Sequence, residues 1–384
     1  MLHQLDLLLR PLEGLESYRQ LRQALEKPGA QGVFGLDDSQ RLHLLAGLCR
    51  DTGRPLILVV PSEQAAARCV QDLSALLPGG VMAFPAREVS FLRTAASSRE
   101  LNMGRLHALG LAVTGRLSAL VVPADALLHR LMPRQVFEKN VIRVREGERR
   151  DPASLMDALI AAGYERVDVT EARGQCALRG GILDVYPIGS DNALRLEFFD
   201  DEIDSLRDFD VMTQRSIARR EAAEIFPAAE VLLSGEEAVA AGERLRQLVV
   251  AACTRDKGPK ASQPDRQREL EREFGLMPYE RFLALMEGED SPAPAAEQPA
   301  PSGKADYALR TSLGRGFAGR IEALLGGRCF PGAESLIHIL YPQTQTLLDY
   351  FHHPIVVMDQ PERLRERCDN RLLEFEEHFK TALE

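Results

Sequence analysis

The loop 35–41 is where this sequence comes nearest to a site for phosphate chemistry, because it is expected to join a short strand, 31–36, to a helix, 40–50. A loop that holds phosphates needs glycines for close backbone approach and a lysine that reaches the phosphates. This loop has one glycine, no lysine and two carboxylates, Asp37 and Asp38, which would repel a nucleoside triphosphate. The sequence therefore predicts no bound nucleotide and no other cofactor.

Other residues that could do chemistry are isolated. Asp359 follows an apolar run, as the metal-holding carboxylate of a nucleotide hydrolase would, but without a phosphate loop it has nothing to coordinate. The alternative is that Asp359 caps the helix that begins after it. His352 and His353 are adjacent, so their side chains are expected to point apart at the surface. We predict no catalytic and no metal-binding residue.

The most informative polar residues lie in the expected strand 193–199, where apolar and polar residues alternate. One face is apolar throughout and would face a core. The other face carries Arg195, Glu197 and Phe199. Arginine and an aromatic residue among acids are typical of a protein-binding hot spot. The alternative is that another part of the same domain covers Phe199.

Composition narrows the class of protein. A chain of 384 residues, 45% hydrophobic and 27% charged, is typical of a soluble globular protein with two or three domains. The formal net charge of −10 is unlike that of a dedicated DNA-wrapping module. The six cysteines form no C-x-x-C pair, which indicates a reducing, cytoplasmic compartment. No apolar run reaches the roughly 20 residues that a membrane span needs.

Strands and helices alternate in the first part of the chain. The strands are expected at 55–60, 81–84 and 119–122, and the helices at 40–50, 63–77 and 97–111. This order predicts an α/β fold with a parallel sheet. The run 55–60 is nearly all apolar, as in a strand that is buried on both faces.

From residue 135 the pattern indicates a small α+β domain of about 85 residues. It should contain a strand at 141–144 and a helix that is capped by Asp151 and ended by Gly163. Further strands follow at 166–170, 182–186, 193–199 and 202–210. The last of these does not keep period two, so we expect a bulge or a change of face in it.

The remainder of the chain is expected to be mainly helical, with helices at 235–252, 264–274, 316–325, 344–351 and 360–383 and strands at 335–340 and 354–358. The Pro/Ala-rich stretch 288–306 is expected to be a flexible loop. The chain stops inside the last helix without a capping signal, which suggests a fragment of something longer.

Several motifs resemble one protein family. AGYERVD, RGGILDVYPIGS, RLEFFDDEIDSLRDFD and TQRS, between residues 162 and 216, follow the order and spacing of the N-terminal region of the bacterial transcription-repair coupling factors. The region also resembles excinuclease B, a component of the excision-repair machinery. Unlike excinuclease B, this chain has no phosphate loop and no aromatic cluster between Phe84 and Arg99 that could stack on bases.

The resemblance implies a degenerate helicase-like (RecA-type) parallel-sheet domain with an inserted smaller α+β domain. The first part of the sheet domain would be 1–125, and 126–216 would be the insert, resembling the second domain of excinuclease B. The chain would return to the sheet domain at 217–359, and 360–384 would begin a following helical segment.

The resemblance also implies a function. The chain would be a non-catalytic, monomeric recruitment module that docks excinuclease A, the partner of excinuclease B, through the insert. The family's contact surface corresponds to Arg179, Arg195 and Phe199, with Arg207 and Arg215 as weaker candidates. The full-length family protein is an ATP-dependent DNA translocase that binds RNA polymerase and duplex DNA, and one of its C-terminal domains would mask this surface.

Two alternatives stay open. The chain could be a nucleotide-dependent helicase or nuclease component, although the loop 35–41 argues against nucleotide binding. It could also bind DNA directly through a local group of basic residues, Arg143, Arg145, Arg149 and Arg150. The acidic net charge of the chain disfavours this second alternative.

Overall fold

The computed structural model describes residues 7–77, 79–87, 99–254 and 312–383. Two compact units make up the chain. Of the described residues, unit 1 contains those up to 130 and from 346 onward, and unit 2 contains those between 131 and 345. The helix predicted at 264–274 and the loop predicted at 288–306 lie outside the described residues.

Unit 1 is built on a parallel sheet. Its strands are β1 (Leu56–Val60), β2 (Val81–Ala83), β3 (Ala119–Pro123) and β12 (Ile355–Met358). The order across the sheet is β12-β1-β3-β2, and every neighbouring pair runs parallel. All residues of β1 and β3 are buried, as their continuous apolar runs predict. The predicted α/β class and parallel sheet are therefore confirmed.

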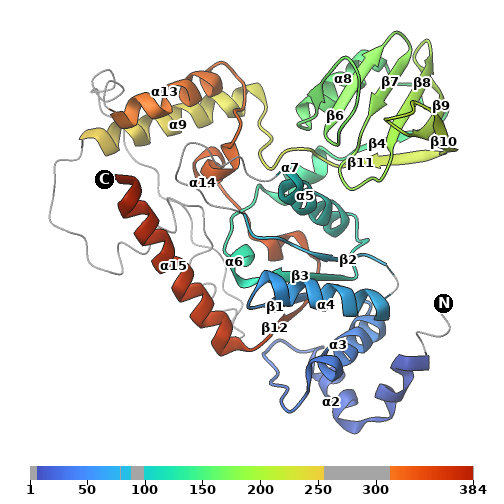
Figure 1. Cartoon of the computed structure of the whole chain (residues 1–384), viewed down its shortest axis with the longest axis vertical. Helices are drawn as coiled ribbons and strands as arrows, with labels where there is room; N and C mark the ends of the chain where they lie inside the picture. The colour runs from blue at the N-terminus through green and yellow to red at the C-terminus, as the bar shows by residue number, and fades with distance from the viewer. Residues whose placement is uncertain (1–6, 78, 88–98, 255–311, 384) are drawn as a thin grey trace. The chain divides into compact units, whose positions relative to one another are not determined.

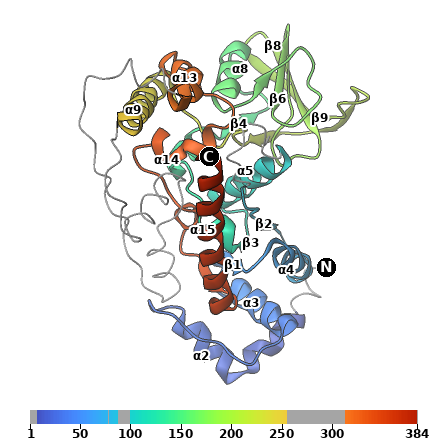
Figure 2. The ribbon, with the colours of Figure 1, turned by 60° about the vertical axis from the view of Figure 1, so that its left-hand side comes forward.

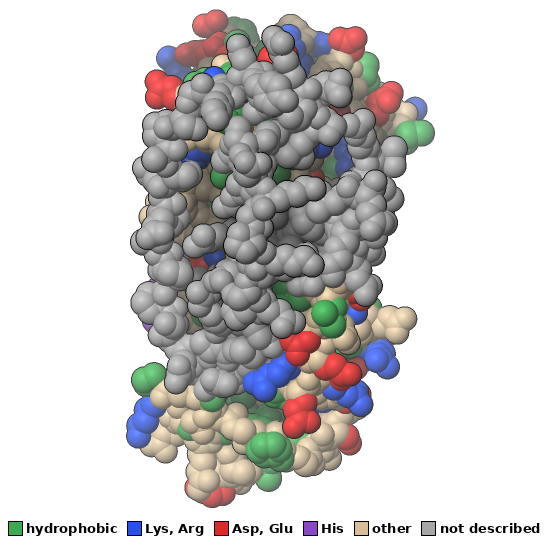
Figure 3. Space-filling model, turned by 90° about the vertical axis from the view of Figure 1, so that its left-hand side faces the viewer, with side chains coloured by type: hydrophobic (Ala, Val, Ile, Leu, Met, Phe, Trp, Pro, Cys, Tyr) green, Lys and Arg blue, Asp and Glu red, His purple; other side chains and the backbone are tan. Residues whose placement is uncertain are grey.

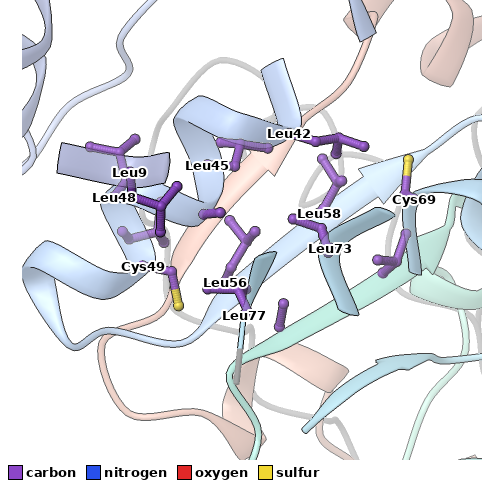
Figure 4. Packing of buried hydrophobic residues seen from close by; sticks show 14 of the residues in the cluster. Leu9, Leu42, Leu45, Leu48, Cys49, Leu56, Leu58, Cys69, Leu73 and Leu77 are labelled. Carbon is purple, nitrogen blue, oxygen red and sulfur yellow. The ribbon is translucent and has the colours of Figure 1, made fainter. Parts of the chain in front are cut away.

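Helices surround this sheet (Figure 1). They are α2 (Glu16–Ala24), α3 (Asp38–Thr52), α4 (Glu63–Leu76), α5 (Arg99–Val113), α6 (Ala124–Leu127) and α15 (Pro361–Leu383), with 3₁₀ turns η1 (Arg10–Gly14) and η3 (Leu347–Tyr350). Figure 4 shows leucines of α3 and α4 packing against Leu56 and Leu58 of β1. Burial of these aliphatic side chains is the main stabilising contribution to this unit.

One strand predicted for unit 1 is wrong. Residues 31–36 form no strand, and their side chains are exposed, with Phe34 at 91%. Gly35 has a φ of +81°, which a strand cannot contain, and Asp37 then caps α3. The sequence made this segment look like a strand because Val33, Phe34 and Leu36 are apolar, but they have no packing partner there to bury them.

Unit 2 contains a six-stranded sheet in the order β10-β9-β8-β7-β6-β5. Its strands are β5 (Glu165–Arg166), β6 (Gln175–Arg179), β7 (Ile182–Val185), β8 (Ala193–Phe199), β9 (Glu202–Phe209) and β10 (Ser216–Arg219). In this sheet β5 and β6 pair in parallel, and the other neighbours are antiparallel. The strand predicted at 166–170 is thus limited to its first residue. The β8–β9 register shifts between Glu197 and Phe198, which confirms the predicted bulge.

Helix α8 (Pro152–Ala161) packs on one face of this sheet (Figures 1 and 2). Leu155, Met156 and Leu159 of α8 are buried against Leu183, Leu194 and other inward residues of β6 to β9. The predicted cap is confirmed, since the Asp151 carboxylate accepts a hydrogen bond from Ser154 N at 2.8 Å. Gly163, at φ +92°, follows the end of the helix as predicted. A second, two-stranded sheet pairs β4 (Ile142–Arg145) with β11 (Ala222–Ile225).

The rest of unit 2 is helical. It consists of α7 (Arg134–Lys139), α9 (Gly235–Thr254), α13 (Ser312–Leu325), η2 (Ala333–Leu336) and α14 (Ile337–Leu340), and α9 and α13 lie side by side (Figures 1 and 2). The strand predicted at 335–340 is therefore wrong. A short apolar run suits a buried helical turn as well as a strand, and here Ile337 and Leu340 are buried three residues apart. None of the helices in the described ranges is long and apolar enough to cross a membrane.

Candidate protein-docking face

One face of the six-stranded sheet lies opposite α8. It carries four of the five predicted docking residues, which are Arg179, Arg195, Phe199 and Arg207. We call this side the outer face. Alternation along β8 buries Leu194 and Leu196 beneath the sheet and turns Arg195 and Glu197 to the outer face, as predicted. The strand register places Arg195 between Asp184 of β7 and Arg207 of β9. Arg179, at the end of β6, lies on the same face.

A buried carboxylate joins two of these arginines. The Asp184 side chain is 1% exposed. Its Oδ2 accepts hydrogen bonds from Arg179 Nη2 at 2.8 Å and Arg195 Nη2 at 2.9 Å, and its Oδ1 accepts one from Arg195 Nε at 2.7 Å. Such charge-assisted, bidentate contacts fix both the position and the orientation of a guanidinium group.

Arg195 is held on all sides. Its Nη2 also donates to Gln214 Oε1 at 3.0 Å, and its guanidinium carbon lies 4.3 Å from the centre of the buried Phe209 ring. The hydrogen bond to Asp184 raises the pKa of Arg195, although burial acts in the opposite direction. The side chain of Arg195 is only 15% exposed, against 47% for Arg179. Arg195 thus points outward as predicted but is mostly enclosed.

Phe199 stands at the open end of β8 and is 80% exposed. The interpretation in which another part of the domain covers it is therefore wrong for the described residues. Ile182, which pairs with Glu197 across β7 and β8, is 37% exposed on the same face. The sequence analysis did not predict Ile182 as a docking residue, because it gives 182–186 only as a strand and assigns no outward face to it.

The two weaker candidates are placed differently. Arg207 Nη2 lies 3.6 Å from Glu197 Oε2, and the Arg207 side chain is 40% exposed. Arg215 is exposed and directly follows Gln214, outside the strands. The outer face thus brings Arg179, Arg195 and Arg207 together, and Arg215 flanks them. The strand pattern alone did not reveal Asp184 or Gln214 as their partners.

The basic group considered for DNA binding is largely neutralised. Arg143 pairs with Glu224 at 2.9 Å, Arg149 lies 3.8 Å from Glu202, and Arg150 lies 3.9 Å from Glu148. These three pairs reduce the local excess of positive charge that phosphate backbones require, while Arg145 is exposed. On part of unit 1, at the lower end of the view in Figure 3, acidic and basic side chains are interspersed.

Polar side chains of the loop 35–41 of unit 1 form hydrogen bonds and ion pairs within the protein. Asp37 Oδ1 accepts a hydrogen bond from Gln40 N at 2.7 Å and so caps α3, in a capping box with the Gln40 side chain. Arg41 lies 3.1 Å from Asp38 and 3.3 Å from Asp359. Burial raises the pKa of Asp359, while Arg41 acts to lower it. Asp359 therefore forms an ion pair with Arg41 beside the carboxyl end of β12.

The two adjacent histidines do not behave as predicted. The rings of His352 and His353 are in contact, with their centres 4.5 Å apart, because His353 adopts a φ of +49° that breaks the alternation of the chain. Both are exposed, as predicted. Within the described residues, no group of three or more histidine, cysteine, aspartate or glutamate side chains could hold a metal ion.

Comparison with known proteins adds the family context. A family model described as "UvrB interaction domain" matches residues 142–230, the segment that contains the outer face. The transcription-repair-coupling factor of Bacillus subtilis (strain 168) is 32% identical over 231 residues, which is 60% of this chain and 20% of that protein. Those of Escherichia coli (strain K12) and Haemophilus influenzae are 33% and 36% identical, over 53% and 45% of this chain.

The chain is related to the transcription-repair-coupling factors. The resemblance inferred from the motifs between residues 162 and 216 is therefore confirmed. The matched part of the chain spans about a fifth of the B. subtilis relative and 18% and 15% of the other two.

Proposed function

We propose that the chain is a non-catalytic recruitment module of transcription-coupled DNA repair, which acts in the cytoplasm and docks excinuclease A through the outer face. The observation that carries the proposal is the arrangement of Phe199 and Arg179 on this face. It lies within the segment that matches the UvrB interaction domain. An exposed aromatic beside a fixed arginine is the composition that dominates binding energy in protein interfaces.

The proposal includes a division of the chain. Residues 126–216 would be the docking domain, inserted between two parts, 1–125 and 217–359, of a degenerate helicase-like domain of RecA type, and 360–384 would lead into a following segment. In a longer protein, RNA polymerase and duplex DNA would be further partners. The protein would be monomeric on its own.

The absence of catalysis is also a proposal, and unit 1 supports it. Ligands of open α/β sheets bind outside the carboxyl ends of the strands, commonly at the first turn of a helix. In unit 1, Asp37 already accepts one of the free N–H groups of that turn of α3, that of Gln40. The one cation of the loop, Arg41, is paired with Asp38 and Asp359. A phosphate group would have to displace these carboxylates.

Titration of purified excinuclease A with the chain tests the docking. We expect Phe199→Ala to weaken binding by ten- to a hundredfold or more, on the order of the loss seen for hot-spot residues. Phe34→Ala is the matched control, since Phe34 is 91% exposed in unit 1 and should leave the affinity unchanged. Equal binding by both variants would place the docking site elsewhere. Failure of the wild-type chain to bind would refute the proposed function.

A further inference from the structure

Asp184 is a charged residue that is buried on the outer face of the sheet, and its burial needs an explanation. Its carboxylate is 1% exposed, and it accepts three hydrogen bonds from Arg179 and Arg195. A buried carboxylate is costly unless it is paired and hydrogen-bonded. Its position opposite Arg195 in the β7–β8 register is fixed by the sheet, so both arginines are drawn to one point.

The two arginines share Asp184 unequally. Arg195 contacts Asp184 through two nitrogens, donates to Gln214 and covers the Phe209 ring, which leaves little of it for a partner. Arg179 contacts Asp184 through Nη2 alone, and its side chain is 47% exposed. Since a guanidinium group has five N–H donors, Arg179 keeps donors for a partner while its position is fixed.

Apolar side chains lie next to this fixed arginine. Ile182 pairs with Arg179 on one side and with Glu197 on the other. Phe199 is two residues beyond Glu197 on β8. Arg179, Ile182 and Phe199 therefore lie at one end of the outer face, with Glu197 between Ile182 and Phe199. We call these three residues the docking patch.

We propose that Asp184 is the positioning residue of the docking patch. Asp184 holds one side of the forked guanidinium group of Arg179 and directs its remaining N–H donors toward a carboxylate of the partner. Ile182 and Phe199 enter an apolar pocket of the partner beside that carboxylate. This inference rests on the proposed docking function and specifies the chemistry of the bound surface. Fixing the arginine in advance removes part of the entropy that binding would otherwise lose.

A double-mutant cycle separates positioning from folding. In the full chain, Asp184→Asn keeps the shape of the side chain but removes its charge, and we expect it to weaken binding to excinuclease A by about tenfold. In the Arg179→Ala background, where no positioned fork remains, Asp184→Asn should change the affinity less than about twofold. Urea unfolding of all four proteins records any change in stability separately.

Four outcomes would overturn the inference. Equal losses in both backgrounds would mean that Asp184 acts through the general stability of the domain. Tighter binding by Asp184→Asn would mean that Asp184 competes with the partner for Arg179. Binding by the wild type without any effect of Asp184→Asn would leave the proposed function intact and refute the positioning role alone, whereas no binding by the wild type would refute both.

If Asp184→Asn does not fold, a second variant tests whether the Arg179 guanidinium group is positioned for a carboxylate. Arg179→Lys keeps the positive charge but lacks the planar fork. If the fork is positioned for a carboxylate, Arg179→Lys should weaken binding nearly as much as Arg179→Ala. Binding of Arg179→Lys at the wild-type affinity would show that charge alone is sufficient and would overturn the proposal.

Discussion

Arginines that look equivalent in the sequence have different surroundings in the folded protein. Arg179 and Arg195 both contact Asp184, yet Arg195 is the one enclosed by Asp184, Gln214 and Phe209. Removal of an enclosed ionic partner leaves a buried charge without compensation, whereas removal of an exposed one mainly affects an interface. Substitutions on the outer face must therefore be judged for stability as well as for binding.

Arg195→Ala should destabilise unit 2. The substitution removes two of the three hydrogen bonds to Asp184 and uncovers Phe209, so we expect the free energy of unfolding to fall by about 3 kcal/mol. Urea denaturation measures this loss. Arg215→Ala, at an exposed arginine that lies outside the strands, should stay within about 0.5 kcal/mol of the wild type. If both variants unfold like the wild type, Asp184 does not depend on Arg195.

The sequence could predict which residues of β8 point outward but not what they contact. Alternation assigns Arg195 and Phe199 to one face from local pattern alone, and the structure agrees on both. The burial of Asp184 depends on the pairing of β6, β7 and β8, which are brought together by two turns. Contacts between side chains on neighbouring strands leave no periodic signal within either strand, so this part of the site required the structure.

At the scale of elements, strong periodicity and clear end signals were predictive. The fully buried strands β1 and β3 and the capped helix α8 lie within a residue or two of where the sequence places them. Two of the errors, at 31–36 and 335–340, are short apolar runs whose conformation depends on packing partners elsewhere in the chain. For such runs, local propensity does not decide between strand, helix and loop.

Gly163, which follows the end of α8, lies so close to Ala228 and Ala229 that a side chain has no room there. It has a φ of +92°, and a Cβ atom there would lie 2.6 Å from the Cβ of Ala229 and 2.9 Å from its nitrogen. We expect Gly163→Ala to lower the free energy of unfolding by about 3 kcal/mol, from left-handed strain and the clash together.

Gly147 is a matched control for this prediction. It has a φ of +80° but nothing within 4 Å of an added Cβ, so Gly147→Ala should cost only the strain, about 1 kcal/mol. Thermal or urea unfolding of the two variants compares them directly. Equal losses would mean that Ala229 moves aside and that the close approach of the two segments is not needed.

At the scale of the whole molecule, the outer face and the capped start of α3 belong to different compact units. Unit 2 carries the outer face, whose arginines are held by contacts within the sheet. Unit 1 has a parallel sheet, Asp37 caps α3, and Arg41 pairs with Asp359 directly after β12. If unit 1 is a degenerate nucleotide-binding fold, as we propose, these internal contacts exclude a nucleotide.

ATP with magnesium should therefore leave the unfolding temperature of the chain unchanged. A ligand at ~5 mM with a Kd of ~50 µM would stabilise the folded state by about 2.7 kcal/mol, which corresponds to a rise of several degrees in the unfolding temperature.

Asp37→Asn is an informative companion variant, because the amide keeps an oxygen for capping Gln40 N but removes one repelling charge. No shift is expected for it either, since Arg41 remains paired with Asp38 and Asp359. A rise of several degrees for the wild type would mean that the internal pairs yield to phosphate and that unit 1 still binds nucleotide; a rise for Asp37→Asn alone would assign the exclusion to that single carboxylate.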